Sequence, residues 1–397
     1  MSRERKGLRR MQDAEVRGRT VVVRADYNVP MKGGVIQDDA RIRASLPTLR
    51  NLLDRGAVVV VLTHLGRPDG GVVESLRLDS IARRLGELLG GPVRKLDDCV
   101  GPDVVREIRA GKVGDVFLLE NLRFHAEEEA NDPTFSDALA ELGDIYVDDA
   151  FGTLHRAHAS TVGIAERRPA YAGLLVEKEI EALSRVLHDP ARPYLAIVGG
   201  KKAADKLGAL RDLVKRADGV LVGGGVAFTF LAASGAAVGA SAVDRNLFED
   251  IRGIVRSAEE RGTEIVLPED VVAATSLAAD AETRVCPADR IPEGWIGFDI
   301  GPQTVRSFEK RIRTAKTVVW AGPMGAFEFG PFLAGTRSVA EAVAASSAYS
   351  VIGGGETGEA IAQLGLESRV SFVSTGGGAC LAYLRGKPLP ALDVLSL

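Results

Sequence analysis

The 397-residue sequence is poor in cysteine and has no long apolar run, and each absence excludes a class of protein. Its cysteines, Cys99, Cys286 and Cys380, lie far apart and form no C-x-x-C pair. This spacing argues against a disulfide framework or a zinc site and fits a reducing compartment. No run of 18 apolar residues occurs, and the first 20 residues lack the apolar stretch of a secretory signal. We therefore expect a cytoplasmic protein with no membrane partner.

Charge is also low, with a formal net value of −4, which argues against nucleic acid or an anionic membrane as the main partner. The composition, 46% hydrophobic and 26% charged, is that of a globular protein. The length exceeds what one core usually organises, so two domains are expected. The sequence by itself does not indicate an oligomeric state.

Apolar runs alternate with amphipathic helical stretches along the whole chain, as in parallel sheets covered on both faces. We expect an α/β protein with two Rossmann-like three-layer α/β/α domains, joined by a hinge helix at 173–190 that Pro190 and Pro193 terminate. The domains are 1–172 and 191–384. The expected strands are 21–24, 57–63, 115–120 and 144–150 in the first half, and 194–200, 219–225, 264–270, 316–323, 349–355 and 370–378 in the second.

Basic and polar residues follow the strands of the first half, at the ends where parallel sheets bind ligands. Since arginine matches phosphate or carboxylate with two donors, several arginines on one edge predict a site for a small, highly charged anion. A single such arginine would more often be an ordinary solvated residue. His125 and His188 are interpreted as ordinary histidines. The strand-end residues are Asp26, Tyr27 and Asn28, then His64, Leu65, Gly66 and Arg67, then Arg123, then His155, Arg156 and His158, with Arg41 shortly after the first strand.

Glycines follow the strands of the second half. Glycine lets backbone N–H groups approach phosphate oxygens, and a helix beginning there adds a favourable dipole. One such turn could exist for steric reasons alone, but five predict a nucleotide cleft. They are Gly199–Gly200, Gly223–Gly225, Gly322–Pro323, Gly353–Gly355 and Gly376–Gly378.

Two common nucleotide-binding motifs do not account for this cleft. GGGETG (353–358) matches G-x-G-x-x-G, but the next strand end is Ser374-Thr375 and offers no acid for a ribose hydroxyl, so an NAD site loses its main support. A G-x-x-x-x-G-K-[ST] sequence is absent. Cys380, just after the last glycines, is interpreted as a packed apolar residue.

At this point the sequence resembles the phosphoglycerate kinase family. VVVRADYNVP, QDDARIRASLP, LTHLGRPDG, LLENLRFH, DDAFGTLHRAHAST, VGGKKAADK, GGGVAFTF, WAGPMGAFE, IGGGETGEAI and VSTGGGACLAYL are similar to that family's motifs and occur in its order. The match extends from about residue 19 to the end of the chain. The resemblance implies reversible phosphoryl transfer between ATP and the carboxylate of 3-phosphoglycerate, giving ADP and 1,3-bisphosphoglycerate, with Mg²⁺ on the nucleotide. It also implies a monomer, and that the tail, about 385–397, returns to the first domain.

The resemblance implies roles for three sets of residues. The substrate would contact Asp26, Tyr27, Asn28, Arg41, His64, Leu65, Gly66, Arg67, Arg123 and Arg156. The nucleotide would contact Gly200, Lys202, Lys206, Gly224, Gly301, Pro323, Glu328, Gly354, Gly355, Glu356 and Thr357, with Glu356 also a candidate for the metal. Arg41, Lys202 and the amides of Gly376, Gly377 and Gly378 would act on the moving phosphoryl group.

This assignment explains why no general base is evident, because a carboxylate nucleophile with a pKa of roughly 4 is already ionised at pH 7. Hinge closure would then bring the two ligands together. Three residues depart from the usual pattern: Lys201 at a normally small position, Ala321 in place of a common Asn, and Glu356 in place of Asp. Two alternatives stay open, an NAD-dependent oxidoreductase and a non-catalytic nucleotide-binding regulator of the same fold.

Overall fold

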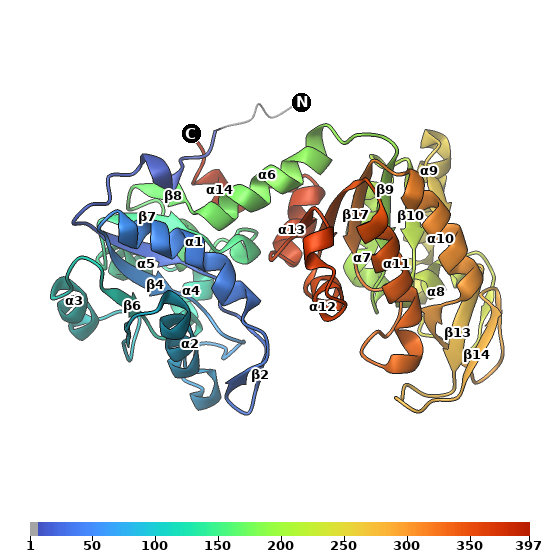
Figure 1. Ribbon diagram of the computed structural model, residues 1–397, viewed down its shortest axis with the longest axis horizontal. Helices are drawn as coiled ribbons and strands as arrows, with labels where there is room; N and C mark the ends of the chain where they lie inside the picture. The colour runs from blue at the N-terminus through green and yellow to red at the C-terminus, as the bar shows by residue number, and fades with distance from the viewer. Residues whose placement is uncertain (1–6) are drawn as a thin grey trace. The chain divides into compact units, whose positions relative to one another are not determined.

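The computed structural model describes residues 7–397, and these divide into two compact units. One consists of the described residues up to Glu181 together with Pro388–Leu397, and the other of Ala182–Lys387. Each unit is an α/β structure built around its own sheet (Figure 1). Among the described residues, no helix has both the length and the apolar character needed to cross a membrane.

The sheet of the first unit has six parallel strands in the order β5-β6-β4-β1-β7-β8. Valine-rich segments form the central strands, because β-branched side chains suit a sheet buried on both faces. The strands are β1 (Thr20–Arg24), β4 (Val58–Leu62), β5 (Val93–Lys95), β6 (Val116–Leu118), β7 (Ile145–Asp148) and β8 (Ala170–Ala172), and a small hairpin pairs β2 (Met31–Lys32) with β3 (Val35–Ile36).

Alternate residues of these strands enter one hydrophobic core with helices α1 and α2; Val21, Val59 and Leu118 are examples. The intervening residues, such as Val60 and Phe117, are also buried and point to the opposite face, so both faces of the sheet are covered. The helices of this unit are α1 (Ala40–Asp54), α2 (Asp79–Leu89), α3 (Pro102–Arg109), α4 (Ala126–Ala130), α5 (Pro133–Ala140) and α14 (Pro390–Asp393).

The C-terminal tail of the chain packs within the first unit. The backbone N–H of Arg9 donates to the carbonyl of Leu395 (2.9 Å), and that of Ala391 donates to the carbonyl of Leu154 (3.2 Å). Leu395 is fully buried. The last residues of the chain are therefore part of the core of the unit that its first residues begin.

The second unit has a six-stranded parallel sheet in the order β12-β10-β9-β17-β18-β19. Side chains from β9 and β17, including Ile197 and Trp320, pack with helices α10, α11 and α12 on one face. The strands are β9 (Tyr194–Val198), β10 (Gly219–Val222), β12 (Glu264–Val266), β17 (Thr317–Ala321), β18 (Tyr349–Gly353) and β19 (Phe372–Val373).

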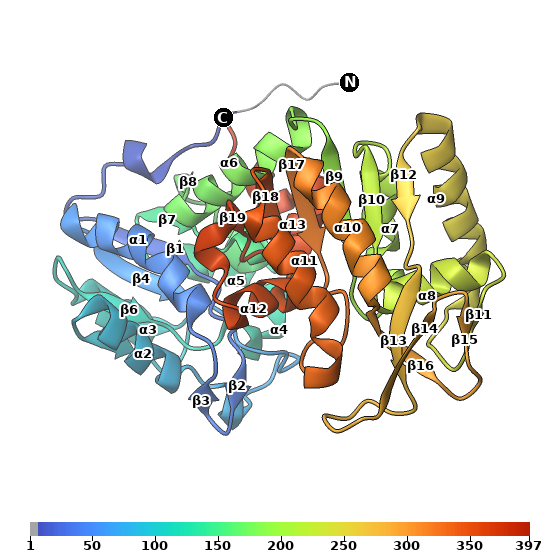
Figure 2. The same cartoon turned by 45° about the vertical axis from the view of Figure 1, so that its right-hand side comes forward.

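A three-stranded antiparallel sheet, β14-β13-β16, and a two-stranded sheet, β11-β15, extend the second unit (Figure 2). They pack with helix α8 in a smaller core around Phe228. These strands are β11 (Ala237–Val238), β13 (Asp270–Ala274), β14 (Thr283–Pro287), β15 (Arg290–Ile291) and β16 (Ile296–Ile300). The helices are α7 (Ala203–Leu213), α8 (Gly224–Ala233), α9 (Phe248–Arg261), α10 (Pro302–Thr314), α11 (Ala334–Ala345), α12 (Gly355–Gln363) and α13 (Gly378–Leu384).

The predicted fold class is confirmed, with two parallel sheets in two units. The predicted strands of both halves occur, although several are shorter than their apolar runs. The edge strands β5 and β8 and the antiparallel sheet were not predicted, because these segments contain short or polar stretches such as VRK and TRVCP. Helix α6 (Leu174–His188) occupies the segment expected to be a hinge; that it acts as a hinge stays a prediction.

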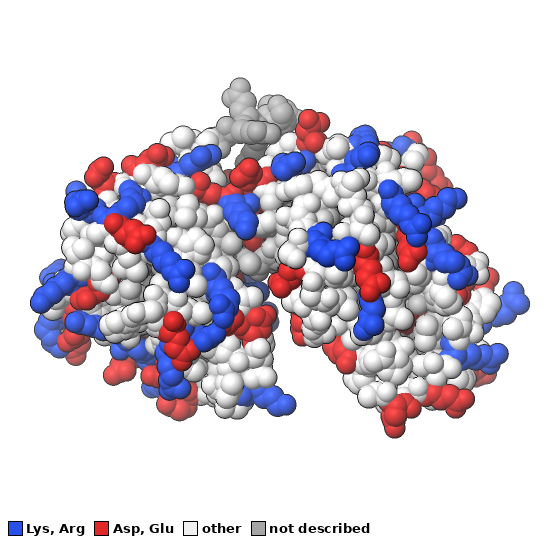
Figure 3. Space-filling view, viewed as in Figure 1, with Lys and Arg blue, Asp and Glu red and all other residues white. Residues whose placement is uncertain are grey.

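Charged side chains of both signs are interspersed over the visible surface of each unit, with no extended area of one sign (Figure 3). This mixing agrees with the small formal net charge of −4. On this face, therefore, positive charge is not gathered into a broad patch.

The buried tail generates a stability prediction. Leu395→Ala should lower the free energy of unfolding of the first unit by about 2–4 kcal/mol, because a buried leucine leaves a cavity when it is shortened. Leu397→Ala is the matched control: Leu397 is 74% exposed, and its loss should change stability by less than about 0.5 kcal/mol. Urea unfolding followed by circular dichroism measures both. Equal stability of the two variants would contradict a structural role for the tail.

Candidate active site

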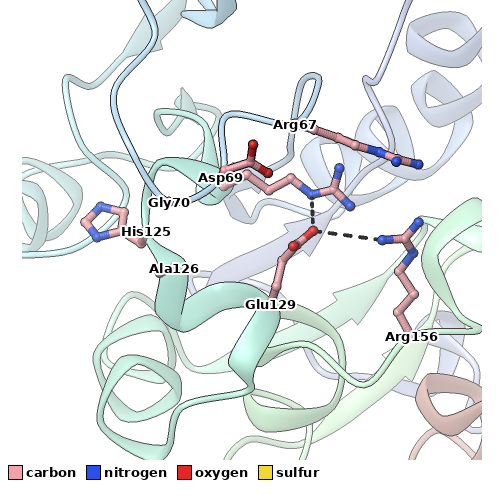
Figure 4. Close-up of a pocket in the computed structure, with 8 residues that line it drawn as sticks. Arg67, Asp69, Gly70, His125, Ala126, Glu129 and Arg156 are labelled. Atoms are coloured by element: carbon pink, nitrogen blue, oxygen red, sulfur yellow. Dashed lines mark ion pairs between the residues drawn. The ribbon is translucent and has the colours of Figure 1, made fainter.

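Cationic side chains gather where β1, β4, β6 and β7 end, at one edge of the first sheet. A pocket of about 470 Å³ opens there (Figure 4). Its volume and its basic lining suit a small phosphorylated acid better than an apolar ligand. The residues around it are Arg67, Asp69, Gly70, Arg123, His125, Ala126, Glu129 and Arg156.

His64 follows β4 and is almost fully buried. Its Nδ1 accepts a hydrogen bond from the guanidinium of Arg24 at 3.1 Å, which requires this nitrogen to be unprotonated. Burial lowers the pKa of His64 well below its usual range, and the charges of Arg24, Arg123, Arg41 and Arg156 lower it further. His64 is therefore a neutral group surrounded by four cations.

Arg24 is the last residue of β1 and is only 1% exposed. Its Nε donates to Ser160 Oγ at 2.8 Å, and that hydroxyl donates in turn to Glu128 at 2.5 Å. Burial favours the neutral form of Glu128, yet hydrogen bonds from His158 and Ser160 and the charge of Arg24 lower its pKa. The hydroxyl of Ser160 thus connects the buried guanidinium of Arg24 to the buried carboxylate of Glu128.

Arg41, in the first turn of α1, pairs with Asp26 at 2.9 Å. The Oδ1 atom of Asn28 accepts a hydrogen bond from the backbone N–H of Gly66 at 2.9 Å, which joins the loops after β1 and β4. Arg41 keeps 30% of its side chain exposed, so donors remain available for a ligand. The structure therefore brings the residues after the first two strands into one constellation.

Arg123 follows β6 and is 6% exposed. Its Nη1 donates to the carbonyl of Gly66 at 2.7 Å, and its Nε lies 3.0 Å from Glu129 Oε1. Asn121 also joins these loops, because its side chain donates to the carbonyl of Leu65 at 2.8 Å. In Figure 4 the side chain of Glu129 points toward Arg156, whose Nη1 lies 3.9 Å away.

Two of the predicted substrate residues do not offer a side chain to the pocket. Tyr27 is fully buried and its hydroxyl shares a hydrogen bond with Ser45 at 2.8 Å, and burial raises its pKa. Leu65 is also buried. Any contact of these two residues with a ligand would have to come from the backbone.

His125, interpreted as an ordinary histidine, is hydrogen-bonded to Asp98 at 2.7 Å and packs against Phe135. The bond to Asp98 raises the pKa of His125, which favours an ion pair. Cys99 lies close enough to both for a three-ligand metal cluster, but the existing ion pair accounts for their proximity. His125 nevertheless lines the pocket, together with Arg123 from the same strand end.

The glycine-rich turns of the second unit meet at the carboxyl edge of its sheet. The N–H of Gly200 donates to the carbonyl of Pro323 at 2.8 Å, and the N–H of Gly322 donates to Thr357 Oγ1 at 2.7 Å. A Cβ atom at Gly224 would lie 2.8 Å from the backbone nitrogen of Gly200, and its φ is +58°. Glycine is therefore needed for close packing of these turns as well as for any ligand.

The lysines of VGGKKAADK surround the start of α7. Lys201 and Lys202 are exposed and Lys206 is half-buried, so the three are not equivalent. Burial lowers the pKa of Lys206, and the charge of Glu356, in the first turn of α12, opposes this shift. Lys206 and Glu356 are thus brought together from two helix starts.

The remaining predicted nucleotide residues also lie at loop and helix starts. Gly354 precedes α12 with φ +103°, and Gly301 precedes α10, where a Cβ atom would contact the carboxylate of Asp270. Glu328 is exposed in the loop after β17. Gly377 precedes α13 with φ +46°, and Gly376 and Gly378 flank it.

Cys380 is buried in α13, as the sequence analysis expected. A Cβ atom at Gly353 would lie 2.9 Å from its sulfur. The cysteine therefore packs against the end of β18.

Sequence reasoning missed Arg24, Asp69, Gly70 and Glu129. Arg24 was assigned to the end of a strand. A sequence does not distinguish a buried arginine at such a position from an exposed one. Glu129 belongs to the run AEEEA, which is typical of a solvent-exposed helix face. The run directly follows LRFH, which contains Arg123. This closeness in the sequence is the signal that could have placed Glu129 near the pocket.

Together these features define an α/β protein with an arginine-lined pocket in one unit and glycine-rich turns at the sheet edge of the other. The sequence profile of the phosphoglycerate kinase family matches residues 11–387. The chain belongs to the phosphoglycerate kinase family.

Relatives and solved structures agree with this assignment. The chain is 52% identical to the phosphoglycerate kinase of Rubrobacter xylanophilus, covering 98% of each chain, and 50% identical to that of Dictyoglomus turgidum, covering 97% of each. The structure of phosphoglycerate kinase from Coxiella burnetii is similar with a TM-score of 0.86 at 39% identity, over 98% of this chain and 99% of that one. The enzyme from Pyrococcus horikoshii OT3 gives 0.87 at 34% identity, over 98% of both.

The cationic surroundings of His64 generate a pH prediction. The imidazole should stay neutral as the pH falls below about 6.5, the usual pKa of histidine. Because the unfolded chain takes up a proton near that pH and the folded chain does not, the free energy of unfolding should fall as the pH decreases from about 6.5. NMR titration of the imidazole resonances measures the protonation directly.

A pair of variants tests the cause. Arg156→Gln removes one of the cations and should raise the pKa of His64. Arg109→Gln, at the end of α3, removes an exposed arginine that pairs with Glu141 and should leave the pKa of His64 unchanged. A His64 that titrates at its usual pH in the wild type would show that the cations do not control it.

Proposed function

We propose that this protein is an active phosphoglycerate kinase that transfers a phosphoryl group reversibly between ATP and the carboxylate of 3-phosphoglycerate. The observation that carries the proposal is the pocket of converging arginines in the first unit, in a chain that belongs to this family over nearly its whole length. The family assignment leaves no support for the oxidoreductase alternative, which depended on GGGETG alone.

In the forward reaction, a carboxylate oxygen of 3-phosphoglycerate forms a bond to the γ-phosphorus of ATP as the bond to the ADP oxygen breaks. The carboxylate is already ionised near pH 7, so no proton has to move and no general base is needed. Catalysis then consists of holding the reactants in line and compensating charge on the transferring group. The residues of the chain supply positions and positive charge.

In the first unit, Arg67, Arg123 and Arg156 would hold the phosphate of the substrate, since their guanidinium groups surround the pocket. Asp26 and Asn28 would contact the rest of the substrate. The pair between Asp26 and Arg41 orients Arg41, whose exposed donors would compensate charge near the reacting carboxylate. His64, being neutral, can accept or donate one hydrogen bond without adding a fifth charge.

In the second unit, Lys206 would bind nucleotide phosphate, because it is half-buried and its Cε would lie 3.5 Å from a Cβ atom added at Gly200. The exposed Lys202 would contact the transferring phosphoryl group, and the N–H groups before α12 and α13 would point at phosphate oxygens. Gly200, Gly224, Pro323, Gly301 and Glu328 would shape the remainder of the nucleotide site.

Mg²⁺ would be held mainly by the nucleotide phosphates. Glu356 fits a supporting role because it is an exposed carboxylate in the first turn of α12, and hard oxygen donors suit this ion. The ion would supply positive charge to the phosphate oxygens.

Three departures from the usual family pattern would adjust nucleotide affinity rather than abolish turnover. Ala321 ends β17 with its side chain buried. The amide group of the Asn that is common at this position is therefore replaced by a buried methyl group. Lys201 is exposed and adds positive charge before α7, and Glu356 reaches one methylene further than Asp. None of these changes removes Arg41, Lys202 or Lys206.

Acyl phosphate formation is the direct test of the proposed activity. Purified protein mixed with MgATP and 3-phosphoglycerate should yield a hydroxamate when hydroxylamine traps the product. Arg41→Ala should reduce the rate by roughly 100-fold to 1,000-fold, the range seen when a donor to developing charge is removed.

Arg43→Ala is the matched control, because Arg43 lies in the same helix, is exposed and pairs with Asp39. Its rate should stay near that of the wild type. ATP binding without hydroxamate formation would favour the non-catalytic regulator and overturn the proposal.

Lys206→Ala tests the nucleotide half independently of turnover. Loss of a charge-assisted contact of about 1.5–3 kcal/mol should weaken MgADP binding by roughly 10-fold to 150-fold. Lys215→Ala is the matched control. Lys215 lies just after the end of α7 and pairs with Asp212, and this variant should bind MgADP normally. Calorimetric titration measures both affinities, and equal values would exclude Lys206 from the site.

A further inference from the structure

A carboxylate lies between two of the three arginines that are proposed to hold the substrate phosphate. Glu129 Oε1 is 3.0 Å from Arg123 Nε and 3.9 Å from Arg156 Nη1. Figure 4 shows the Glu129 side chain directed from α4 into this space. An anionic group of the protein therefore occupies the position in which an anionic group of a ligand would have to bind.

The charges explain why a carboxylate is held there. Burial lowers the pKa of Arg123, and Arg156 and Arg24 lower it further, whereas the charge of Glu129 opposes these effects. A nearly buried guanidinium among other cations is unfavourable unless an anion lies close by. Glu129 supplies this anion when no ligand is present.

The geometry also leaves Glu129 able to move away. Its side chain is 51% exposed, compared with 6% for Arg123, and it belongs to the short helix α4. Arg123 is fixed separately, because its Nη1 donates to the carbonyl of Gly66. The arginine can therefore keep its place while the carboxylate turns toward solvent.

The neighbouring acidic residues cannot take this role. Glu128 is fully buried and accepts hydrogen bonds from the backbone N–H and the hydroxyl of Ser160. Glu127 is exposed in the same helix and pairs with neither arginine. Asp69 lines the pocket from the loop after β4, and neither of these two arginines pairs with it.

We propose that Glu129 is an internal competitor that sets the affinity of the pocket for anions. It holds Arg123 and Arg156 in the ligand-free protein and must leave them when the phosphate group of the substrate binds. This inference rests on the proposed function for the identity of the substrate, but the competition itself requires only that an anion binds to the two arginines.

Competition of this kind has a consequence for selectivity. The substrate has to displace Glu129 from the arginines. When Glu129 occupies them most of the time, a weakly bound inorganic anion adds little further competition. Without Glu129 the substrate binds more tightly, but inorganic phosphate or sulfate then competes directly. Glu129 thereby makes substrate binding less sensitive to simple anions at the cost of some affinity.

Glu129→Gln tests the proposal, because it removes the charge and keeps the shape of the side chain. Calorimetric titrations with inorganic phosphate and with 3-phosphoglycerate should each show affinity raised about fivefold, the factor expected for losing one partly exposed ion pair as competitor. Added sulfate should weaken 3-phosphoglycerate binding more in the variant than in the wild type. The ligand-free variant should also melt at a lower temperature, with a larger rise on adding phosphate.

Glu127→Gln is the matched control, since it removes the same charge from the same helix without touching either arginine, and it should behave as the wild type. A fivefold gain in this variant too would show a general charge effect and overturn the proposal. Weaker or unchanged binding in Glu129→Gln would overturn it as well, because Glu129 would then be part of the binding site or irrelevant to it.

The phosphate titration also separates this proposal from the proposed function. Tighter phosphate binding in Glu129→Gln supports the internal competitor even if the hydroxamate assay fails. Hydroxamate formation by the wild type with no change in phosphate affinity would support the kinase and reject the competitor.

Discussion

The first unit depends on one buried cation. Arg24 ends β1 inside the protein, where an unpaired guanidinium would be strongly unfavourable. It donates hydrogen bonds to His64 and to Ser160, and the hydroxyl of Ser160 donates to Glu128. Because Glu128 lies in α4, this chain of hydrogen bonds also fixes the helix that carries Glu129. The arrangement of the anion pocket therefore follows from how a single buried charge is compensated.

The two units place different chemical groups at the carboxyl edges of their sheets. The first uses side-chain charge: arginines at successive strand ends around a neutral histidine. The second has mainly backbone at the corresponding edge, in glycine turns that pack closely and hydrogen-bond to one another. Fixed charges suit a compact phosphorylated acid, whereas backbone donors spread over several turns suit the longer polyphosphate of a nucleotide.

Much of this could be predicted because parallel strands bring their carboxyl ends to one edge. Once the apolar runs were assigned to strands, the positions of His64, Arg123 and Arg156 after different strands implied that they converge, and they do. The orientation of individual side chains was less accessible. Tyr27 lies between Asp26 and Asn28 in the sequence, but the alternation of the backbone turns its side chain into the core. The edge strands were missed because a short polar segment pairs only when a neighbouring strand is already in place.

The sequence by itself determined the order of strands and helices, the residue types at each strand end and the family to which the chain belongs, since all three depend on local patterns and their order. Only the tertiary structure decided which charges meet. The pairing of Arg24 with Ser160 and Glu128, the neutral state of His64 and the position of Glu129 between two arginines depend on the packing of α4 against the sheet edge. Charge interactions and pKa values depend on distance and burial, and these exist only once segments far apart in the chain have come together.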